Sequence, residues 1–103
     1  MKIKVKIVKL GKQRYDYVFK RLSKYKSNLF EVEIEKIDFL PNPKKDNKYS
    51  DEEIKDLLEP FLNLEKNEIL ISFLDYEIDD DFYARDLIDN KVYVASFFQV
   101  FDN

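Results

Sequence analysis

The residues best suited to bind a ligand are the acids between Asp75 and Asp86. They occupy the first, third, fifth, seventh and twelfth positions of a twelve-residue window, which is the ligand spacing of a calcium loop. The sixth position is Asp80, where such a loop needs glycine, and the twelfth is an aspartate instead of a bidentate glutamate. Cation binding is therefore a hypothesis beside the favoured interpretation, a solvated acidic loop. The candidate cation ligands are Asp75, Glu77, Asp79, Asp81 and Asp86.

These acids follow the most apolar segment of the chain, Ile69 to Leu74, which only Ser72 interrupts. A strand that is apolar on both sides must be covered on both sides, so this segment is predicted to be the central strand of a sheet. Open α/β sheets bind their ligands at the carboxyl ends of such strands. The acidic segment is therefore predicted to lie at a binding edge.

Carboxylates beside aromatic anchors suit a basic protein surface. We therefore expect the acidic segment to bind a basic partner protein. Arg85 is the single base among seven acids from Asp75 to Asp89 and is predicted to pair with Asp81, Asp86 or Asp89. The predicted partner-binding residues are Asp75, Tyr76, Glu77, Asp79, Asp80, Asp81, Tyr83 and Arg85.

The residue types that are missing argue against an enzyme. The chain has no histidine and no cysteine, which removes the commonest general base and most zinc ligands. Its single glycine, Gly11, is too few for a phosphate-binding loop or a dinucleotide fingerprint. We therefore expect no cofactor and a non-enzymatic interaction module, such as an inhibitor, an adaptor or an antitoxin-like subunit.

The charges are divided unevenly along the chain. Residues 1–48 carry 14 lysines and arginines against 6 acids, whereas residues 49–103 carry 4 against 15. A basic first half could bind nucleic acid, and this is the second alternative function. The lysines of the first strand, however, are expected to face the glutamates at positions 31, 33 and 35 across the sheet, which favours internal pairing. The candidate nucleic-acid residues are Lys12, Arg14, Lys20, Arg21, Lys24 and Lys26.

Periodicity gives the remaining elements. Residues 2–10 and 30–35 alternate between charged and apolar side chains, and the helical spacing of residues 13–27 between them predicts a right-handed βαβ unit. Ser50 and Glu53 form a capping box for a second helix, which Pro60 should end near Glu59. Residues 82–88 and 91–100 are predicted to form a hairpin. We expect a single domain, residues 1–103, of the α/β class (α+β being possible), with a two-layer mixed sheet in the order β-α-β-α-β-(β)-β.

Three segments carry a resemblance to a known family. Ile71-Ser72-Phe73-Leu74-Asp75 is an apolar strand ending in an acid, Phe82-Tyr83-Ala84-Arg85 fits an edge strand, and Val92 to Ser96 fits a final strand ending near a serine. This layout resembles the first half of archaemetzincin-type zincins. The resemblance implies a zinc peptidase that needs a His-Glu-x-x-His helix, and these 103 residues contain no histidine. The first alternative function is therefore a catalytically incomplete zincin-like half.

The N-terminus alternates lysine with isoleucine and valine and lacks the apolar core of a signal peptide. No segment reaches the length of a membrane span. We therefore expect a cytoplasmic protein that does not enter a membrane.

Overall fold

The fold is built on two neighbouring parallel strands, β1 (Ile3–Leu10) and β2 (Phe30–Ile37), which helix α1 (Asp16–Ser23) connects. The computed structural model describes residues 2–11, 16–24, 27–44, 48–74, 77–78 and 84–96. The predicted βαβ unit is confirmed within these ranges. The expected helix residues 13–15 and 25–26 lie outside them, as do the expected strand residues 82–83 and 97–100.

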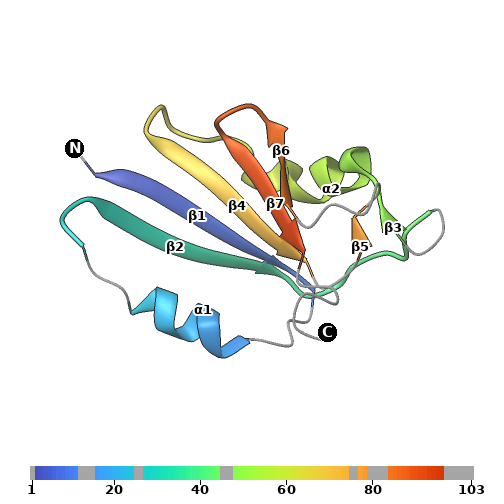
Figure 1. Cartoon of the computed structure of the whole chain (residues 1–103), viewed down its shortest axis with the longest axis horizontal. Coiled ribbons are helices and arrows are strands. Elements are labelled where there is room, and N and C mark those ends of the chain that lie inside the picture. The colour runs from blue at the N-terminus through green and yellow to red at the C-terminus, as the bar shows by residue number, and fades with distance from the viewer. Residues whose placement is uncertain are drawn as a thin grey trace.

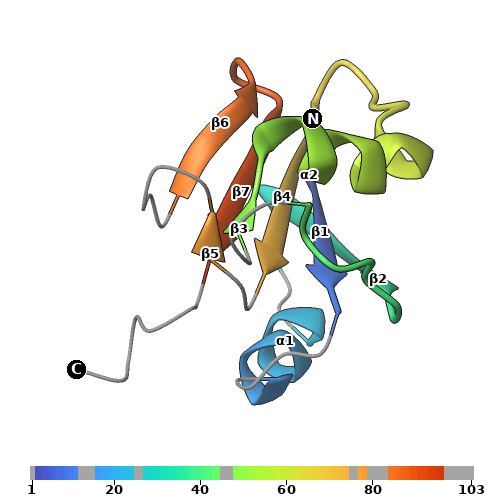
Figure 2. The same cartoon turned by 90° about the vertical axis from the view of Figure 1, so that its right-hand side faces the viewer.

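Strand β4 (Glu68–Leu74) is the central strand, as predicted, and the main sheet has the order β2-β1-β4-β7-β6. It pairs in parallel with β1 on one side and with β7 (Val92–Ser96) on the other. Strand β6 (Ala84–Ile88) runs antiparallel to β7 at the edge, as Figure 2 shows. The turn between them includes Asn90 at a positive φ of 61°, a conformation that asparagine tolerates well. The predicted α/β class and mixed sheet are confirmed.

The two helices pack on opposite faces of the sheet. Phe19 of α1 meets Phe73 of β4 edge to face, with ring centroids 5.3 Å apart. Ile54 and Leu58 of helix α2 (Asp51–Leu58) join a buried cluster that includes Leu74, the residue after Phe73. Because neighbouring residues of a strand point to opposite faces, each helix covers its own side of the sheet. In Figure 1, α1 is drawn below β2 and α2 at the upper right, next to β6 and β7. We predicted two layers, whereas the sheet has one short helix on each face.

The capping box of α2 is confirmed. The Ser50 hydroxyl accepts the Glu53 N–H at 3.2 Å, and the Glu53 carboxylate accepts the Ser50 N–H at 3.3 Å. The α-helix ends at Leu58 and continues as the 3₁₀ turn η1 (Glu59–Phe61). Pro60 explains this change, because its ring excludes an α-helical hydrogen bond at that position.

Two short strands, β3 (Lys48–Tyr49) and β5 (Glu77–Ile78), form a separate parallel pair that periodicity did not predict. Tyr49 is 1% exposed and donates its hydroxyl to the Pro41 carbonyl, which ties β3 to the preceding loop. Strand β5 lies three residues after the end of β4. The segment that we predicted to be a loop is therefore partly a strand.

Candidate functional site

The carboxyl edge of β4 has the topology of a ligand-binding edge. The chain leaves β1 toward β2 on one side and returns, through α2, to β4 on the other side of β1. The two connections therefore diverge between β1 and β4, which is the switch point where open α/β sheets bind ligands. Leu10 and Leu74, the last residues of the two strands, are paired in register and fully buried. The acidic segment begins directly after Leu74.

Gly11 shapes this edge on the β1 side. Its φ is +74°, and it donates its N–H to the Ile37 carbonyl at 2.7 Å. A Cβ at this position would lie 2.8 Å from Leu40 Cδ1. Glycine therefore suits the positive φ of this turn, and a larger residue would also have to displace the end of the Leu40 side chain.

Most of the predicted partner-binding residues fall outside the described ranges. Asp75, Tyr76, Asp79, Asp80, Asp81 and Tyr83 are among these. Glu77 is described only as part of the backbone of β5, in register with Lys48. The structure therefore anchors one point of the acidic segment to β3.

The candidate cation site is affected in the same way. Of its five residues, only Asp86 has a described side chain, and that side chain is exposed on β6. Among the described residues, no group of three or more carboxylates is placed to hold a metal ion. Calcium binding by residues 75–86 stays a prediction.

Arg85 has a partner that the sequence did not predict. Its guanidinium Nη1 lies 2.9 Å from Asp51 Oδ1, in the first turn of α2, instead of pairing with Asp86 or Asp89. Its side chain is 18% exposed. Asp81, the third predicted partner, lies outside the described residues. The ion pair joins the edge strand β6 to the start of α2, so Arg85 has a structural role that the sequence did not reveal.

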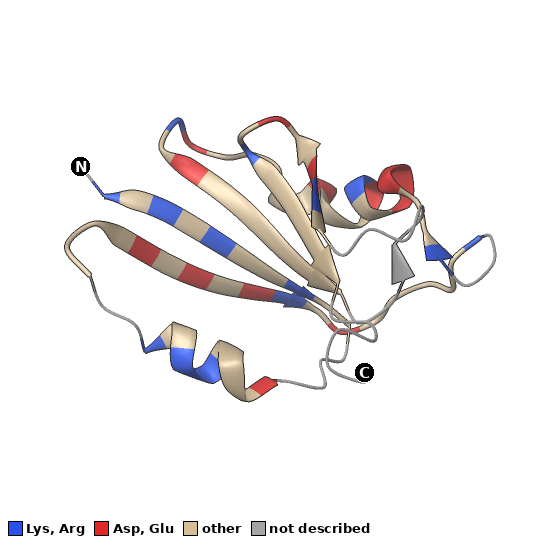
Figure 3. Ribbon diagram, viewed as in Figure 1, with Lys and Arg blue, Asp and Glu red and all other residues tan. Residues whose placement is uncertain are grey.

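The lysines of β1 and the glutamates of β2 share one face of the sheet, as predicted. Lys4 is in register with Glu31 and Lys6 with Glu33, and Figure 3 shows the two charges as bands along adjacent strands. The ion pairs, however, form with residues at the start of β4. Lys4 Nζ lies 2.8 Å from Glu65 Oε2, and Lys6 Nζ lies 3.9 Å from Glu68 Oε2. Lys4 and Lys6 therefore form their ion pairs on the β4 side of β1 and not with the glutamates of β2.

A groove of about 420 Å³ lies between β1, β2 and the turn that precedes β4. Its lining combines the two lysines with carboxylates on both sides: Lys4, Val5, Lys6, Glu31, Val32, Glu33, Asn63, Glu65 and Glu68. Glu68 is only 6% exposed, and its Oε1 also accepts the Glu65 N–H at 3.1 Å. Glu31 and Glu33 form the exposed acidic wall.

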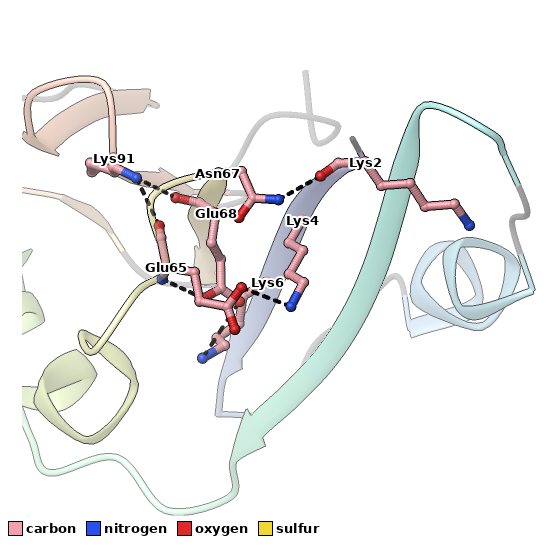
Figure 4. Close-up of polar contacts among 7 residues, drawn as sticks. All are labelled: Lys2, Lys4, Lys6, Glu65, Asn67, Glu68 and Lys91. Atoms are coloured by element: carbon pink, nitrogen blue, oxygen red, sulfur yellow. Dashed lines mark hydrogen bonds and ion pairs between the residues drawn. The ribbon is translucent and has the colours of Figure 1, made fainter.

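The turn before β4 is fixed by polar contacts, and Figure 4 draws those among Lys2, Glu65, Asn67, Glu68 and Lys91. Lys91 Nζ donates to the carbonyls of Glu65, Lys66 and Glu68 at 3.0, 2.8 and 3.0 Å. Asn67 Nδ2 donates to the Lys2 carbonyl at 2.6 Å. The β6–β7 turn and the start of β1 therefore both hold the start of β4. Sequence analysis missed these residues, although Glu68 at the head of an apolar strand was a signal.

The charges at the groove shift the pKa values of three side chains, Lys4, Glu33 and Glu65. The carboxylate of Glu65 raises the pKa of Lys4 through their hydrogen bond, and Lys4 in turn lowers the pKa of Glu65. Glu33 behaves differently, because its hydrogen bond with Glu35 raises its pKa above the usual value. The neighbouring Glu35 carboxyl therefore disfavours the charged form of Glu33.

The basic residues of α1 are exposed. Lys20 and Arg21 of α1, and Lys24 just after it, are exposed, whereas Phe19 is 2% exposed and packs against Phe73 of the sheet. The other candidate nucleic-acid residues, Lys12, Arg14 and Lys26, lie outside the described ranges. The described part of α1 therefore has the basic outer face that its sequence predicts.

A scan against models of protein families, a search of curated proteins and a search of solved structures each found no match. The resemblance to archaemetzincin-type zincins stays a prediction, which the coding sequence beyond Asn103 would test. Neither helix in the described part of the chain has the length and apolar character needed to cross a membrane.

Proposed function

We propose that the chain is a non-enzymatic interaction module whose acidic segment, residues 75–81, binds a basic surface on a partner protein. The segment follows the central strand at the switch point of the sheet, where bound groups are usually found. Its five carboxylates and one tyrosine provide charge for attraction and an aromatic anchor for affinity.

The observation that carries this proposal is how the lysines of β1 are used. Lys4, Lys6 and Lys9 each have an acidic partner within the fold, namely Glu65, Glu68 and Asp16. Lys9 is the one nearest the carboxyl end of β1, and its Nζ lies 2.8 Å from Asp16 Oδ1. The lysine row of β1 is therefore paired within the fold, and a basic partner is the proposed source of further positive charge for the acidic segment.

Charge reversal tests the proposal. The triple variant Asp79→Lys, Asp80→Lys and Asp81→Lys should fold but fail to retain the partner in a tagged pull-down from the source cell. A matched control places the same three changes on the exposed side of α2 and its end, at Glu52, Asp56 and Glu59. Retention of the same partner by both triple variants would show that residues 79–81 do not bind it.

Nucleic-acid binding through α1 is a second candidate, favoured by the exposure of Lys20, Arg21 and Lys24. Neutralising phosphates releases counterions, so such binding would weaken steeply with salt. A gel shift with duplex DNA and with single-stranded RNA, repeated at two salt concentrations, tests it. A missing or salt-insensitive shift removes this candidate.

A further inference from the structure

Strand β2 is an edge strand of the main sheet. It is the outermost strand of the main sheet, and β1 is its only strand partner among the described residues. In a parallel ladder, each residue directs its backbone N–H and C=O to the same neighbour. Ile3 N–H donates to the Leu29 carbonyl, and Gly11 N–H donates to the Ile37 carbonyl. The odd-numbered residues of β2 therefore direct their backbone N–H and C=O groups toward β1. The backbone groups of Val32, Ile34 and Lys36 therefore point outward.

The two faces of β2 differ sharply in character. Glu31, Glu33 and Glu35 lie on the face that carries the groove, and none of them forms an ion pair within the described part of the chain. Phe30, Val32 and Ile34 lie on the other face, where Phe30 remains 39% exposed beside Ile3, which is 45% exposed. A strand added at this edge would therefore find acids on one face and apolar side chains on the other.

The fold already contains one strand that fits this pattern. β1 places Lys4 opposite Glu31 and Lys6 opposite Glu33 on one face, with Ile3 opposite Phe30 and Val5 opposite Val32 on the other. Lys4 and Lys6 form their ion pairs with Glu65 and Glu68, so the acids of β2 could still bind the cations of an added strand. The pKa of Glu33 is raised by Glu35, and a cation placed beside these two acids would favour the charged form of Glu33.

A second copy of β2 fits the same edge poorly. Antiparallel pairing of two such edges about Glu33 would place Glu33 opposite its own copy and Glu31 opposite Glu35. Like charges directly opposite one another destabilise strand pairing. The glutamate row therefore disfavours self-association, which is a known hazard of exposed edges, while it favours a basic strand.

We propose that the outer edge of β2 is a docking site for an extended peptide segment in which basic and apolar residues alternate. The backbone of Val32, Ile34 and Lys36 forms the hydrogen bonds of an added strand. The glutamate row of β2 binds the lysines or arginines of the segment, and the apolar row of β2 packs against its apolar side chains. This surface is separate from the acidic segment 75–81, so the inference does not rest on the proposed function.

A peptide titration tests the proposal. The probe is an acetylated and amidated peptide of alternating lysine and valine, as long as β2, added to the isotopically labelled full chain. Binding should shift the backbone amide signals of residues 30–37 and slow hydrogen exchange at Val32 and Ile34. A peptide of the same composition with its lysines and valines in separate blocks, and one of alternating glutamate and valine, should bind more weakly.

Two variants separate the charge contribution from the backbone contribution. Glu31→Gln with Glu33→Gln should weaken binding by about two- to thirty-fold, the range given by two cross-strand charge pairs. The control is Glu52→Gln with Glu59→Gln on the exposed part of α2 and its end, which changes the net charge equally and should leave binding unchanged. Val32→Pro removes an outward N–H that β1 does not use and should also weaken binding.

The proposal has clear failures. If the alternating and block peptides bind equally, or if the amide shifts map away from β2, the edge is not a docking site. If the unliganded chain is a dimer paired through β2, a second copy is the occupant and the proposal is overturned. These outcomes are measured on the unaltered chain. The proposal can therefore be refuted even if one of the variants fails to fold.

Discussion

Replacing Lys91 by methionine should destabilise the fold through one well-defined loss. The ammonium group donates to three backbone carbonyls of the turn before β4, at 2.8 to 3.0 Å. Methionine keeps an unbranched, largely apolar side chain but has no donor. Lys91→Met therefore removes the three hydrogen bonds while preserving most of the packing.

The size of the effect follows from where the carbonyls lie. Hydrogen bonds to charged groups contribute about 1.5–3 kcal/mol each when they are well shielded from water. Here one ammonium serves three carbonyls, and the contacts to Glu65 and Lys66 are exposed, so water can replace the lysine there. We expect a total loss of about 1–3 kcal/mol in the free energy of unfolding. A domain of this size loses about 4–8 °C in Tm for each kcal/mol.

Urea unfolding followed by circular dichroism measures this change, and Lys66→Met is its matched control. Lys66 lies in the same turn and has an exposed side chain, so its replacement alters charge and length in the same way. Lys91→Met should also accelerate hydrogen exchange at Leu70, whose N–H donates to the Lys91 carbonyl at 2.8 Å. If the two variants are equally stable, the three hydrogen bonds do not hold the turn as we argue.

Two further predictions concern backbone strain and pH. Gly11→Ala should lower the free energy of unfolding by about 1 kcal/mol or more in urea, because φ is +74° and the new Cβ would lie 2.8 Å from Leu40 Cδ1. Gly11→Asn should be less harmful if φ is the main cause. For Glu33, the hydrogen bond with Glu35 raises the folded-state pKa above 4.5, so its stabilising contribution is present below that value and is lost as pH rises through the folded pKa. Glu33→Gln should therefore gain stability relative to the unaltered chain at neutral pH, with the difference vanishing in acid; a difference that grows in acid would contradict this sign.

Local patterns were enough to predict the strands and the start of α2. Alternation over residues 2–10 and 30–35 places charged and apolar side chains on opposite faces, and the structure has both strands there. The capping box at Ser50 and Glu53 is a short-range arrangement, and all of its hydrogen bonds join residues at most three positions apart. Such features depend on near neighbours in the chain, so sequence alone identifies them.

Partner choice between distant elements could not be predicted in the same way. The alternation of β1 predicted that its lysines would face Glu31 and Glu33, and the register confirms this. The register also places Lys4 beside Glu68 of β4, on the other side of the strand. A lysine side chain is long enough to reach either neighbour, so its choice depends on where the turn at residues 63–67 puts Glu65. The partner of Arg85, which is 34 positions away at Asp51, was missed for a similar reason.

The ion pairs of the β1 lysines bear on both proposed surfaces, the acidic segment 75–81 and the outer edge of β2. Lys4 and Lys6 pair with Glu65 and Glu68, and in the described part of the chain the acids of β2 form no ion pair. The acidic segment begins at the opposite end of β4, so the two acidic surfaces lie at different edges of the sheet. Changes at distant sites that share no contacts usually have additive effects. A partner that needs both surfaces should therefore lose affinity in proportion to the product of the separate losses, whereas a partner that uses one surface should respond to one set of variants alone.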